Sequence, residues 1–357
     1  MSSSICRRRR VGALDRTGHA VVIEQAAPAP KHGQVLVRVK ASLISAGTEL
    51  AGARAARAAG RTDPGRPQPF GYQNAGQVVA VGRGVKRFSP GDRVACMGGG
   101  FALHTDLAAV PQNLCARMPD GLDDEQAVYV HLAATSLHAV RRAQIQLGEY
   151  VLVMGLGVVG QLAGQFAALD GAYVMGSDPL DWRCRVAVRC GFAATAVTGE
   201  HDLECAARTF TDGHGFDHAV LAFSGEGTDT FELVKQLMKR SPDGHEMGNV
   251  VLVGGLTTQC LWGAAMGNLN LLGAARTGPG YHDRRWEHGQ RPYPCTLTRW
   301  TTRSNMVLVL RLMAEGRIKT GPLTSHRLPL TRIDEAVSLH LDAPHKTLGT
   351  VLLMDEP

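Results

Sequence analysis

The feature of the sequence that most constrains its fold is the segment YVLVMGLGVVGQLAGQFAALDGAYVMGSD, from Tyr150 to Asp178. An apolar run typical of a buried strand covers 150–154, and a helical pattern follows to residue 169 or 170. A second apolar strand ends at Asp178, and three glycines between the first strand and the helix have the spacing G-x-G-x-x-G. This order of strand, turn, helix and strand predicts an α/β fold with a doubly wound parallel sheet that binds a dinucleotide.

The three glycines have separate expected roles. Gly155 allows the tight turn out of the strand, Gly157 lets a pyrophosphate approach the backbone, and Gly160 lets the helix pack closely on the sheet. The helix begins with Val158 and Val159, and its N-terminus offers N–H groups and a positive partial charge to phosphates. We therefore expect these five residues to contact the cofactor. The alternative is a glycine-rich turn without a ligand.

Asp178, at the end of the second strand, bears on the identity of the cofactor. A carboxylate at this position would accept hydrogen bonds from both hydroxyls of the adenosine ribose and would repel a 2′-phosphate. The sequence thus favours NAD over NADP. Arg183 leaves NADP open, because an arginine nearby can hold a 2′-phosphate, and its other possible role is to flank the ribose or adenine.

Two later segments continue the alternation of strands and helices. FDHAVLAFSG (Phe216–Gly225) and GNVVLVGGL (Gly248–Leu256) each predict a buried strand that ends in small residues. Because ligands bind at the carboxyl ends of the strands in such sheets, Ser224, Val253 and Gly254 are candidate contacts of the nicotinamide half. Ordinary turns between strand and helix would explain the same residues equally well.

The regions on either side of this module have a different pattern. Before residue 140, short β-rich pieces alternate with Gly/Pro turns, which predicts a β-barrel-like domain with few helices. Near the end, SNMVLVLRLMAEGRI predicts a helix and KTLGTVLLM a strand. We expect one domain over 1–139 and 288–357 and a dinucleotide-binding domain over 140–287, with the active site between the two lobes.

Charge and cysteine content exclude some classes of protein. The net charge is +6, and much of the basic excess lies in Arg7–Arg10, which we interpret as a solvated tail. No basic-aromatic motif accompanies this run, so we expect neither a nucleic-acid nor a membrane partner. The arginine run is followed by VGALDRTGHA, whereas a secretion signal would have an apolar core there, so we expect no secretion signal. The eight cysteines contain no C-x-x-C pair, which predicts reduced thiols in a cytoplasmic protein.

Motifs along the whole chain carry a family resemblance. The sequence resembles the medium-chain dehydrogenase/reductase family, which includes alcohol dehydrogenase. The segments that carry the resemblance are GQVLVRVKASLISAGTEL, GYQNAGQVVAVG, RFSPGDRV, the glycine segment and VVLVGG. The resemblance implies a GroES-like substrate domain and a Rossmann domain. One branch of that family has a closer similarity to this sequence, in the segments SLISAGTE, HTDLAAVPQNLC, GPGYHDRRWEHGQRPYP and RSNM with AEGRI. This branch contains bacteriochlorophyllide dehydrogenases and the dehydrogenase half of two-domain oxidoreductases from bacterial sugar-polymer gene clusters.

The resemblance also bears on a metal site. Zinc members of the family hold their catalytic metal with a cysteine before a Gly-Thr-Asp-like triplet, the histidine of Gly-His-Glu, and a third ligand near the domain boundary. In this sequence, Ala46 occupies the position of the cysteine, Tyr72 that of the histidine and His131 that of the third ligand. Gln73 replaces the glutamate of Gly-His-Glu. A catalytic zinc site needs three protein ligands, and the four-cysteine structural zinc lobe is missing between Gly91 and Pro119. We therefore expect no zinc.

Without zinc, side chains must handle the proton of the substrate. Tyr72 is expected to donate a hydrogen bond to the substrate oxygen, and His131 to give or accept the proton. Thr48 matches the hydroxyl relay of the family, Glu49 would orient a neighbour or bind a substrate hydroxyl, and Thr135 is a candidate cofactor contact. Alternatively, Tyr72 fills the space of the metal, His131 is a core histidine, and Thr48 and Glu49 bond to backbone in a turn.

The segment YHDRRWEHGQ, which includes Tyr281, His282, Arg284 and Trp286, resembles a loop of the substrate cleft in the closer branch. Its charged and hydroxyl groups favour a polar substrate, although a solvated surface loop would have the same composition. Four residues are candidate substrate contacts: Gln73, His104, Tyr281 and Arg303.

The sequence therefore favours a zinc-independent, NAD-dependent oxidoreductase of a polyhydroxylated alcohol or ketone, such as a cyclitol, aminocyclitol or sugar derivative. Two alternatives stay open: reduction of an activated C=C bond in a cyclic enone, and a dinucleotide-binding protein without turnover. The family resemblance also implies a homodimer formed through the edge of the Rossmann sheet.

Overall fold

The computed structural model describes residues 8–199 and 203–354, which form two compact units. Unit 1 holds residues 8–131, 279–316 and 324–354, and unit 2 holds residues 132–278 and 317–323. The first limit lies near the start of helix α3 (Val130–Ala143), and the second places the whole loop with Tyr281 in unit 1. The limits expected from the sequence, after 139 and after 287, fall further along the chain.

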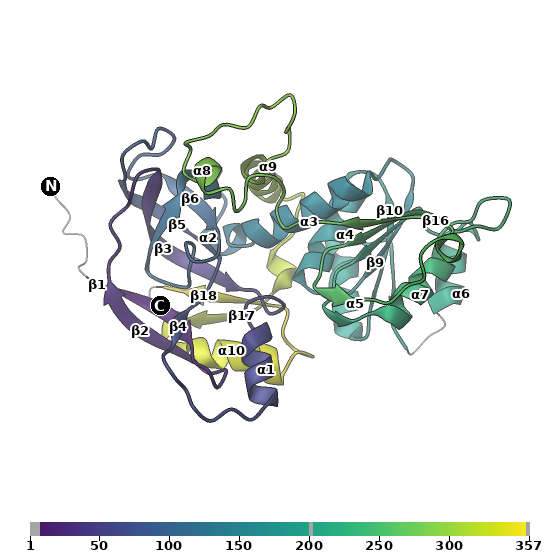
Figure 1. Cartoon of the computed structure of the whole chain (residues 1–357), viewed down its shortest axis with the longest axis horizontal. Coiled ribbons are helices and arrows are strands. Elements are labelled where there is room, and N and C mark those ends of the chain that lie inside the picture. The colour runs from purple at the N-terminus through teal and green to yellow at the C-terminus, as the bar shows by residue number, and fades with distance from the viewer. Residues whose placement is uncertain (1–7, 200–202, 355–357) are drawn as a thin grey trace. The chain divides into compact units, whose positions relative to one another are not determined.

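Unit 2 is built on a parallel sheet, which confirms the predicted α/β fold. Among the residues described, six strands have the order β11-β10-β9-β12-β14-β16. Figure 1 labels β9, β10 and β16 of this sheet. The chain order reverses between β9 and its neighbours β10 and β12, and a crevice for a ligand opens at such a point in parallel sheets. The strands are β9 (Tyr150–Met154), β10 (Tyr173–Asp178), β11 (Ala194–Val197), β12 (His218–Leu221), β14 (Met247–Leu252) and β16 (Asn268–Gly273).

Helices cover this sheet and bury apolar side chains against it. Helix α4 packs on β9 and β10, and α5 packs on β10 and β11. The core contains Leu152, Phe216 and Phe231, all fully buried. The other elements of unit 2 are α4 (Val158–Leu169), α5 (Asp181–Cys190), α6 (Leu203–Phe210), α7 (Thr228–Leu237), β13 (Gly225–Glu226), β15 (Leu256–Thr257), and the 3₁₀ turns Ala264–Met266 and Gly321–Leu323.

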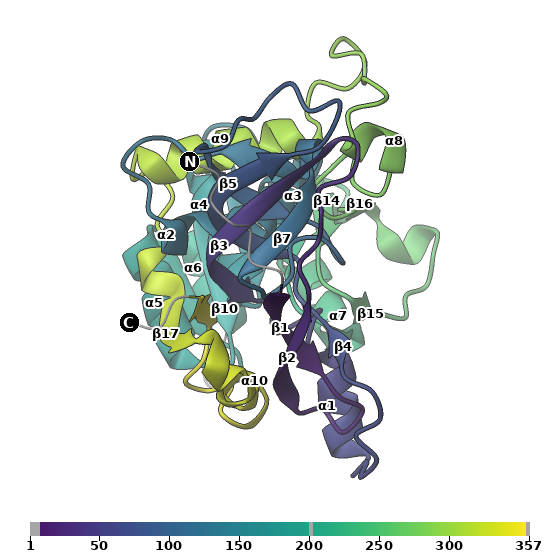
Figure 2. The ribbon, with the colours of Figure 1, turned by 90° about the vertical axis from the view of Figure 1, so that its left-hand side faces the viewer.

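Unit 1 is mainly antiparallel β-structure, which agrees with the predicted GroES-like domain. Within the described chain, its larger sheet has the strand order β17-β18-β3-β5-β6-β8. Strand β7 also pairs with β3, and both are labelled with β5 in Figure 2. A small sheet has the order β2-β1-β4. The strands are β1 (Arg8–Leu14), β2 (Ala20–Ala26), β3 (Gln34–Ile44), β4 (Gln68–Pro69), β5 (Gln73–Val81), β6 (Arg93–Met97), β7 (Leu107–Pro111), β8 (Cys115–Arg117), β17 (Thr324–Pro329) and β18 (Gly349–Leu353).

Short helices close the edges of these sheets. Helix α10 packs on β2, β17 and β18, and α9 packs on β8. The helical elements of unit 1 are α1 (Ala51–Ala58), α2 (Asp124–Ala127), α8 (Arg284–Glu287), α9 (Thr302–Ala314), α10 (Ile333–Asp342), and the 3₁₀ turns Gln112–Leu114 and Leu330–Arg332. No helix in the described parts of the chain is long and apolar enough to cross a membrane.

The interpretation of the N-terminal arginine run as a solvated tail is wrong for Arg8, Arg9 and Arg10. All three belong to β1, which pairs with β2 over its whole length. Their guanidinium groups have specific partners: Arg8 pairs with Glu24 at 2.8 Å, and Arg10 with Asp106 at 3.4 Å. These partners come from distant parts of the chain, so composition gave no sign of them. Arg7 lies outside the described residues.

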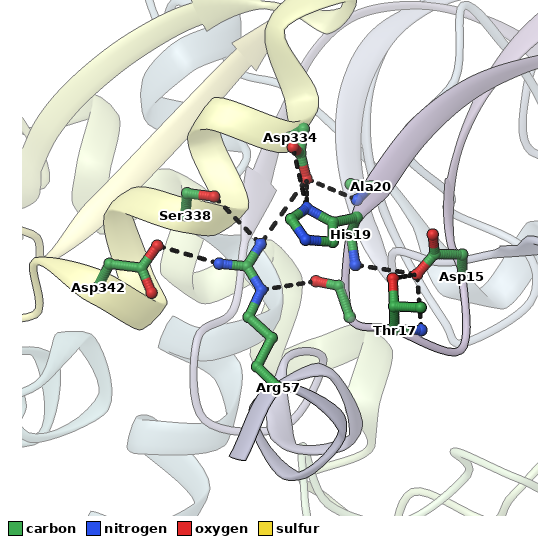
Figure 3. Close-up of polar contacts among 9 residues, drawn as sticks. Asp15, Thr17, His19, Ala20, Arg57, Asp334, Ser338 and Asp342 are labelled. Atoms are coloured by element: carbon green, nitrogen blue, oxygen red, sulfur yellow. Dashed lines mark hydrogen bonds and ion pairs between the residues drawn. The ribbon is translucent and has the colours of Figure 1, made fainter. Parts of the chain in front are cut away.

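An ionic cluster anchors helix α1, which directly follows the segment with Thr48 and Glu49. Arg57 donates hydrogen bonds to the backbone carbonyl of Gly18, to Ser338 and to Asp342 (Figure 3). Asp334 accepts a hydrogen bond from the N–H of Ala20 at 2.8 Å and lies 3.8 Å from Arg57. The cluster ties α1 and the β1–β2 turn to α10.

Candidate functional site

Tyr72 is positioned by the glycine that precedes it. Gly71 has φ +117°, a region that side chains disfavour, and a Cβ there would lie 2.5 Å from the backbone nitrogen of His104. The chain can therefore pass close to the 103–104 segment, where the N–H of His104 donates to the carbonyl of Phe70 at 3.1 Å. This close approach brings Tyr72 and His104 into one part of unit 1.

The Tyr72 hydroxyl lies within hydrogen-bonding reach of the hydroxyls of Ser45 and Thr48. Removal from water raises the pKa of Tyr72 far above that of an ordinary phenol, and the carboxylate of Glu49 raises this pKa further. The two neighbouring hydroxyls offset part of this shift. Tyr72 therefore stays protonated at neutral pH and can donate a hydrogen bond.

Glu49 and His104 form a buried pair beside Tyr72. Nε2 of His104 lies 3.2 Å from Oε2 of Glu49, and Nδ1 of His104 lies 2.8 Å from the Ser42 hydroxyl. The N–H of Ser45 also donates to Glu49 Oε2 at 3.0 Å. The other carboxylate oxygen, Oε1, is buried and has no hydrogen-bond partner. Since a carboxylate has acceptor capacity on both oxygens, Oε1 can accept from a ligand.

His131 and Tyr281 complete this group. The rings of Tyr72 and His131 meet edge to face with centroids 4.4 Å apart, and Tyr281 lies 5.7 Å from His131. Nδ1 of His131 lies 3.3 Å from the backbone carbonyl oxygen of Tyr72, so in the neutral ring Nδ1 carries the proton and Nε2 is the basic nitrogen. The N–H of Gly99 donates to the Tyr281 hydroxyl at 2.9 Å. We call Thr48, Glu49, Tyr72, His104, His131 and Tyr281 the Tyr72 cluster.

Gln73 and Arg303, two further candidate substrate contacts, do not belong to the Tyr72 cluster. Gln73 is fully buried, and its amide nitrogen donates to the carbonyl of Leu43 at 3.3 Å. Arg303 lines a cavity of unit 1 with Arg87 and Asn113, and no member of the Tyr72 cluster lines that cavity.

The residues at the zinc positions of the family do not fit a zinc ion. Ala46 has no donor atom, and a phenol with a raised pKa, as in Tyr72, is a poor ligand. In residues 8–199 and 203–354, no group of three or more His, Cys, Asp or Glu side chains is arranged to hold a metal ion. None of the cysteines that the structure describes forms a disulfide.

The glycine turn of unit 2 leaves room where a phosphate would approach. A Cβ on Gly160 would overlap the carbonyl oxygen of Gly155, so only glycine permits this contact between turn and helix. A Cβ on Gly157 would meet no atom within 4 Å, which means that this backbone faces open space. Gly157 is the N-cap of α4, whose first residues are Val158 and Val159. The turn and helix N-terminus therefore fit a bound pyrophosphate.

Asp178 also holds the glycine turn. Its Oδ2 accepts from the N–H of Leu156 at 2.8 Å, its Oδ1 accepts from the N–H of Leu180 at 2.9 Å, and Arg183 lies 3.5 Å from Oδ2. The carboxylate is 3% exposed. Oδ1, with one contact, keeps a second lone pair for a ribose hydroxyl, so binding of NAD is compatible with these contacts.

The remaining cofactor candidates lie along unit 2. Thr135 is on α3, one residue before Ser136, whose hydroxyl donates to the carbonyl of Val159 at 2.8 Å. Ser224 follows β12, and Val253 and Gly254 follow the adjacent β14. The N–H of Val253 donates to the carbonyl of Leu221 at 3.1 Å. These three residues thus lie at the carboxyl ends of neighbouring parallel strands.

Sequence reasoning missed several of the groups that surround these sites. Ser45 lies one helical turn before Glu49, and this spacing could have indicated their contact. Ser42 is fully buried in β3 and reaches His104 through the fold alone. Arg87 and Asn113 come from separate loops, so no local pattern links them to Arg303.

Comparison with known proteins finds a family model that matches one continuous segment, which begins in unit 1 and ends in unit 2. Residues 31–169 match the family model described as alcohol dehydrogenase GroES-like domain. Among solved structures, an oxidoreductase/dehydrogenase of unknown specificity from Escherichia coli superposes with a TM-score of 0.79 at 19% identity, covering 98% of this chain and 100% of that chain. At this identity the superposition establishes the fold alone.

Two sequence relatives act on polyhydroxylated compounds, as their names state. The chain is 26% identical to the L-galactonate-5-dehydrogenase of Escherichia coli over 339 residues, which are 86% of this chain and 88% of the relative. It is 28% identical to a sorbitol dehydrogenase of Halalkalibacterium halodurans over 238 residues, 58% of this chain and 67% of the relative.

Proposed function

We propose that this chain is a member of the medium-chain dehydrogenase/reductase family and that it transfers a hydride between NAD(P) and a polar, polyhydroxylated alcohol or ketone. The observation that carries the proposal is the Tyr72 cluster, which offers a phenol donor, a histidine and a buried carboxylate in unit 1. Unit 2 would bind the dinucleotide at Gly155, Gly157 and Gly160.

The bound dinucleotide would supply the hydride acceptor for alcohol oxidation. Tyr72 would hold the substrate oxygen by donating a hydrogen bond to it, since the raised pKa keeps the phenol protonated. Tyr72 is therefore not the base. The proton released from the substrate hydroxyl would be accepted at Nε2 of His131, because Nδ1 faces the carbonyl of Tyr72. In the direction of reduction, His131 would return this proton to the carbonyl oxygen.

We propose that this chemistry proceeds without zinc. The side chains at the family's ligand positions support this, because Ala46 provides no ligand and Tyr72 remains a neutral phenol. The hydrogen bond from Tyr72 would then polarise the carbonyl in place of the metal.

Glu49 supports a substrate with more than one hydroxyl group. Its Oε1 is buried without a partner, and a second hydroxyl of a polyol would satisfy it. The names of the two sequence relatives are consistent with such a substrate. We also propose NAD as the preferred cofactor, since the Asp178 carboxylate would repel a 2′-phosphate.

The test is a panel of polyols, cyclitols, sugar acids and cyclic enones, assayed with NAD, NADP and their reduced forms after metal analysis of the purified protein. We expect absorbance of NADH to rise with at least one polyhydroxylated alcohol, and substoichiometric zinc. Loss of enone absorbance without alcohol oxidation would assign C=C reduction instead. About one zinc per chain, removable with loss of activity, would disprove the zinc-independent mechanism.

A further inference from the structure

Unit 1 contains a cavity of about 230 Å³ that the proposed chemistry does not use. Arg87 contributes from the loop before β6, Asn113 from the 3₁₀ turn after β7, and the segment 286–304 forms the remaining wall. Such a volume admits a small ligand, because one molecule in liquid water occupies about 30 Å³.

The charge of this cavity is positive and unbalanced. Arg87, Arg299 and Arg303 line it, and no aspartate or glutamate does. In the part of the chain that the structure describes, none of these three guanidinium groups forms an ion pair, whereas Arg311 on the same helix pairs with Glu315. Burial lowers the pKa of Arg303, and the neighbouring charge of Arg87 lowers it further. A bound anion would remove the repulsion between these cations.

The hydrogen-bonding groups of the cavity are also incomplete. Nε of Arg303 and Oδ1 of Asn113 are both buried without a partner. Asn113 is 6% exposed, and its amide nitrogen donates to the backbone carbonyl of Trp286, which leaves the oxygen as an acceptor. The cavity therefore offers charged donors to an oxyanion and one acceptor to a hydroxyl group.

We propose that this cavity binds a phosphate group, either free or as the monoester of a small polyhydroxylated compound. Arginine guanidinium matches phosphate oxygens with two parallel hydrogen bonds, and arginines from two segments can contact a tetrahedral anion from different sides. The N-terminus of α9, capped by Thr301, adds a positive partial charge at the same wall. Binding at this cavity requires neither a dinucleotide nor turnover, so it is independent of the proposed activity.

The first test is a titration of the full chain with inorganic phosphate. Calorimetry measures the heat of binding, and thermal unfolding measures the melting temperature. We expect phosphate to bind the wild type and to raise its melting temperature, with a dissociation constant at least about tenfold higher in Arg303→Gln. Arg311→Gln, on the solvent side of α9, is the matched control and should bind phosphate like the wild type. If Arg303→Gln does not fold, exposed Arg87→Gln provides the same measurement.

Two results would overturn the proposal: no binding of phosphate to the wild type, or equal binding to the wild type and both cavity variants. The source of the phosphate is tested with sorbitol 6-phosphate, sorbitol and inorganic phosphate on the same protein. Tighter binding of the monoester than of phosphate identifies an ester ligand, and equal binding identifies free phosphate. Sorbitol bound as tightly as its monoester contradicts the proposal. Failure of the proposed oxidoreductase activity would instead be seen as absent turnover, with the heat of phosphate binding unchanged.

Discussion

Nε2 of His104 lies 3.2 Å from Oε2 of Glu49, and the two side chains are 0% and 4% exposed. A carboxylate so deeply enclosed needs its partners, and here they are His104 and the N–H of Ser45. Its remaining oxygen, Oε1, has none and is the group that we assign to a substrate hydroxyl.

This assignment predicts a loss of activity in Glu49→Gln. We expect kcat/KM for the best polyol to fall on the order of a hundredfold, because the amide lacks the charge that accepts the hydroxyl. A substrate analogue without that hydroxyl should lose little further activity in the variant. Glu24→Gln, on the exposed strand β2, is the control and should behave like the wild type. Equal losses for the polyol and its deoxy analogue in Glu49→Gln would contradict the contact.

The phenol of Tyr72 provides a second prediction. Tyr72→Phe keeps the ring against His131 and removes only the hydroxyl, so kcat should fall about 10²- to 10³-fold while the melting temperature changes little. Tyr173→Phe, on an exposed strand position of unit 2, should leave kcat unchanged. Wild-type kcat in Tyr72→Phe would show that Tyr72 only fills space.

Two glycines of the same turn should respond differently to alanine. Gly160→Ala should lower the free energy of unfolding by about 1–3 kcal/mol, since the new Cβ overlaps the carbonyl oxygen of Gly155. Gly157→Ala should leave stability unchanged, because no atom lies within 4 Å of the new Cβ. It should nevertheless weaken binding of the dinucleotide if the pyrophosphate lies there. Unfolding curves and a fluorescence titration with NADH measure the two effects, and unaltered affinity in Gly157→Ala would exclude that position.

His138 on α3 predicts a loss of stability in acid. Burial lowers its pKa from the ordinary value of 6.5, and the charges of Arg142 and Arg141 lower it further. Below pH 6.5 the unfolded chain therefore binds more protons than the folded chain, so stability falls as the pH falls. Melting temperatures measured from about pH 8 to pH 5 should decline less in His138→Gln than in the wild type. His245→Gln, at an exposed position, should follow the wild type, and parallel curves for all three proteins would refute the assignment.

Arg57 should contribute strongly to the stability of unit 1. Its side chain is 19% exposed and its guanidinium donates to three acceptors, so Arg57→Ala should cost about 1–3 kcal/mol in the free energy of unfolding. Arg54→Ala, exposed on the same helix, is the matched control with little expected effect. A similar small effect of both substitutions in urea unfolding would mean that the cluster adds nothing measurable.

The fold could be predicted because its strongest signals are local. The segment 150–178 carries strand, glycine turn, helix and strand in one continuous stretch, and each part takes the conformation that its residues favour alone. The arginine run shows the limit of such reasoning. Arg8, Arg9 and Arg10 belong to a strand because β2 and the 106–107 segment supply their partners, and no local pattern encodes those contacts.

The candidate sites show the same limit, because local motifs identify single residues but not the contacts between distant segments. Tyr72 and His131 could be singled out by their positions in the family motifs, but their contact depends on chain segments that are far apart in the sequence. The cavity at Arg303 could not be predicted, because its positive charge depends on the approach of Arg87 to the distant pair Arg299 and Arg303, and on the absence of a carboxylate in their common wall.

The place of β18 between β17 and β3 has a consequence for synthesis in the cell. Residues Ala41–Ile44 of β3 pair with β18, so this part of an early strand has an uncovered edge until residues 349–353 are made. While the ribosome makes the intervening residues, this edge exposes unpaired N–H and C=O groups that invite aggregation. Chains truncated just before residue 349 should therefore need chaperones or precipitate, even though they contain all the residues of unit 2.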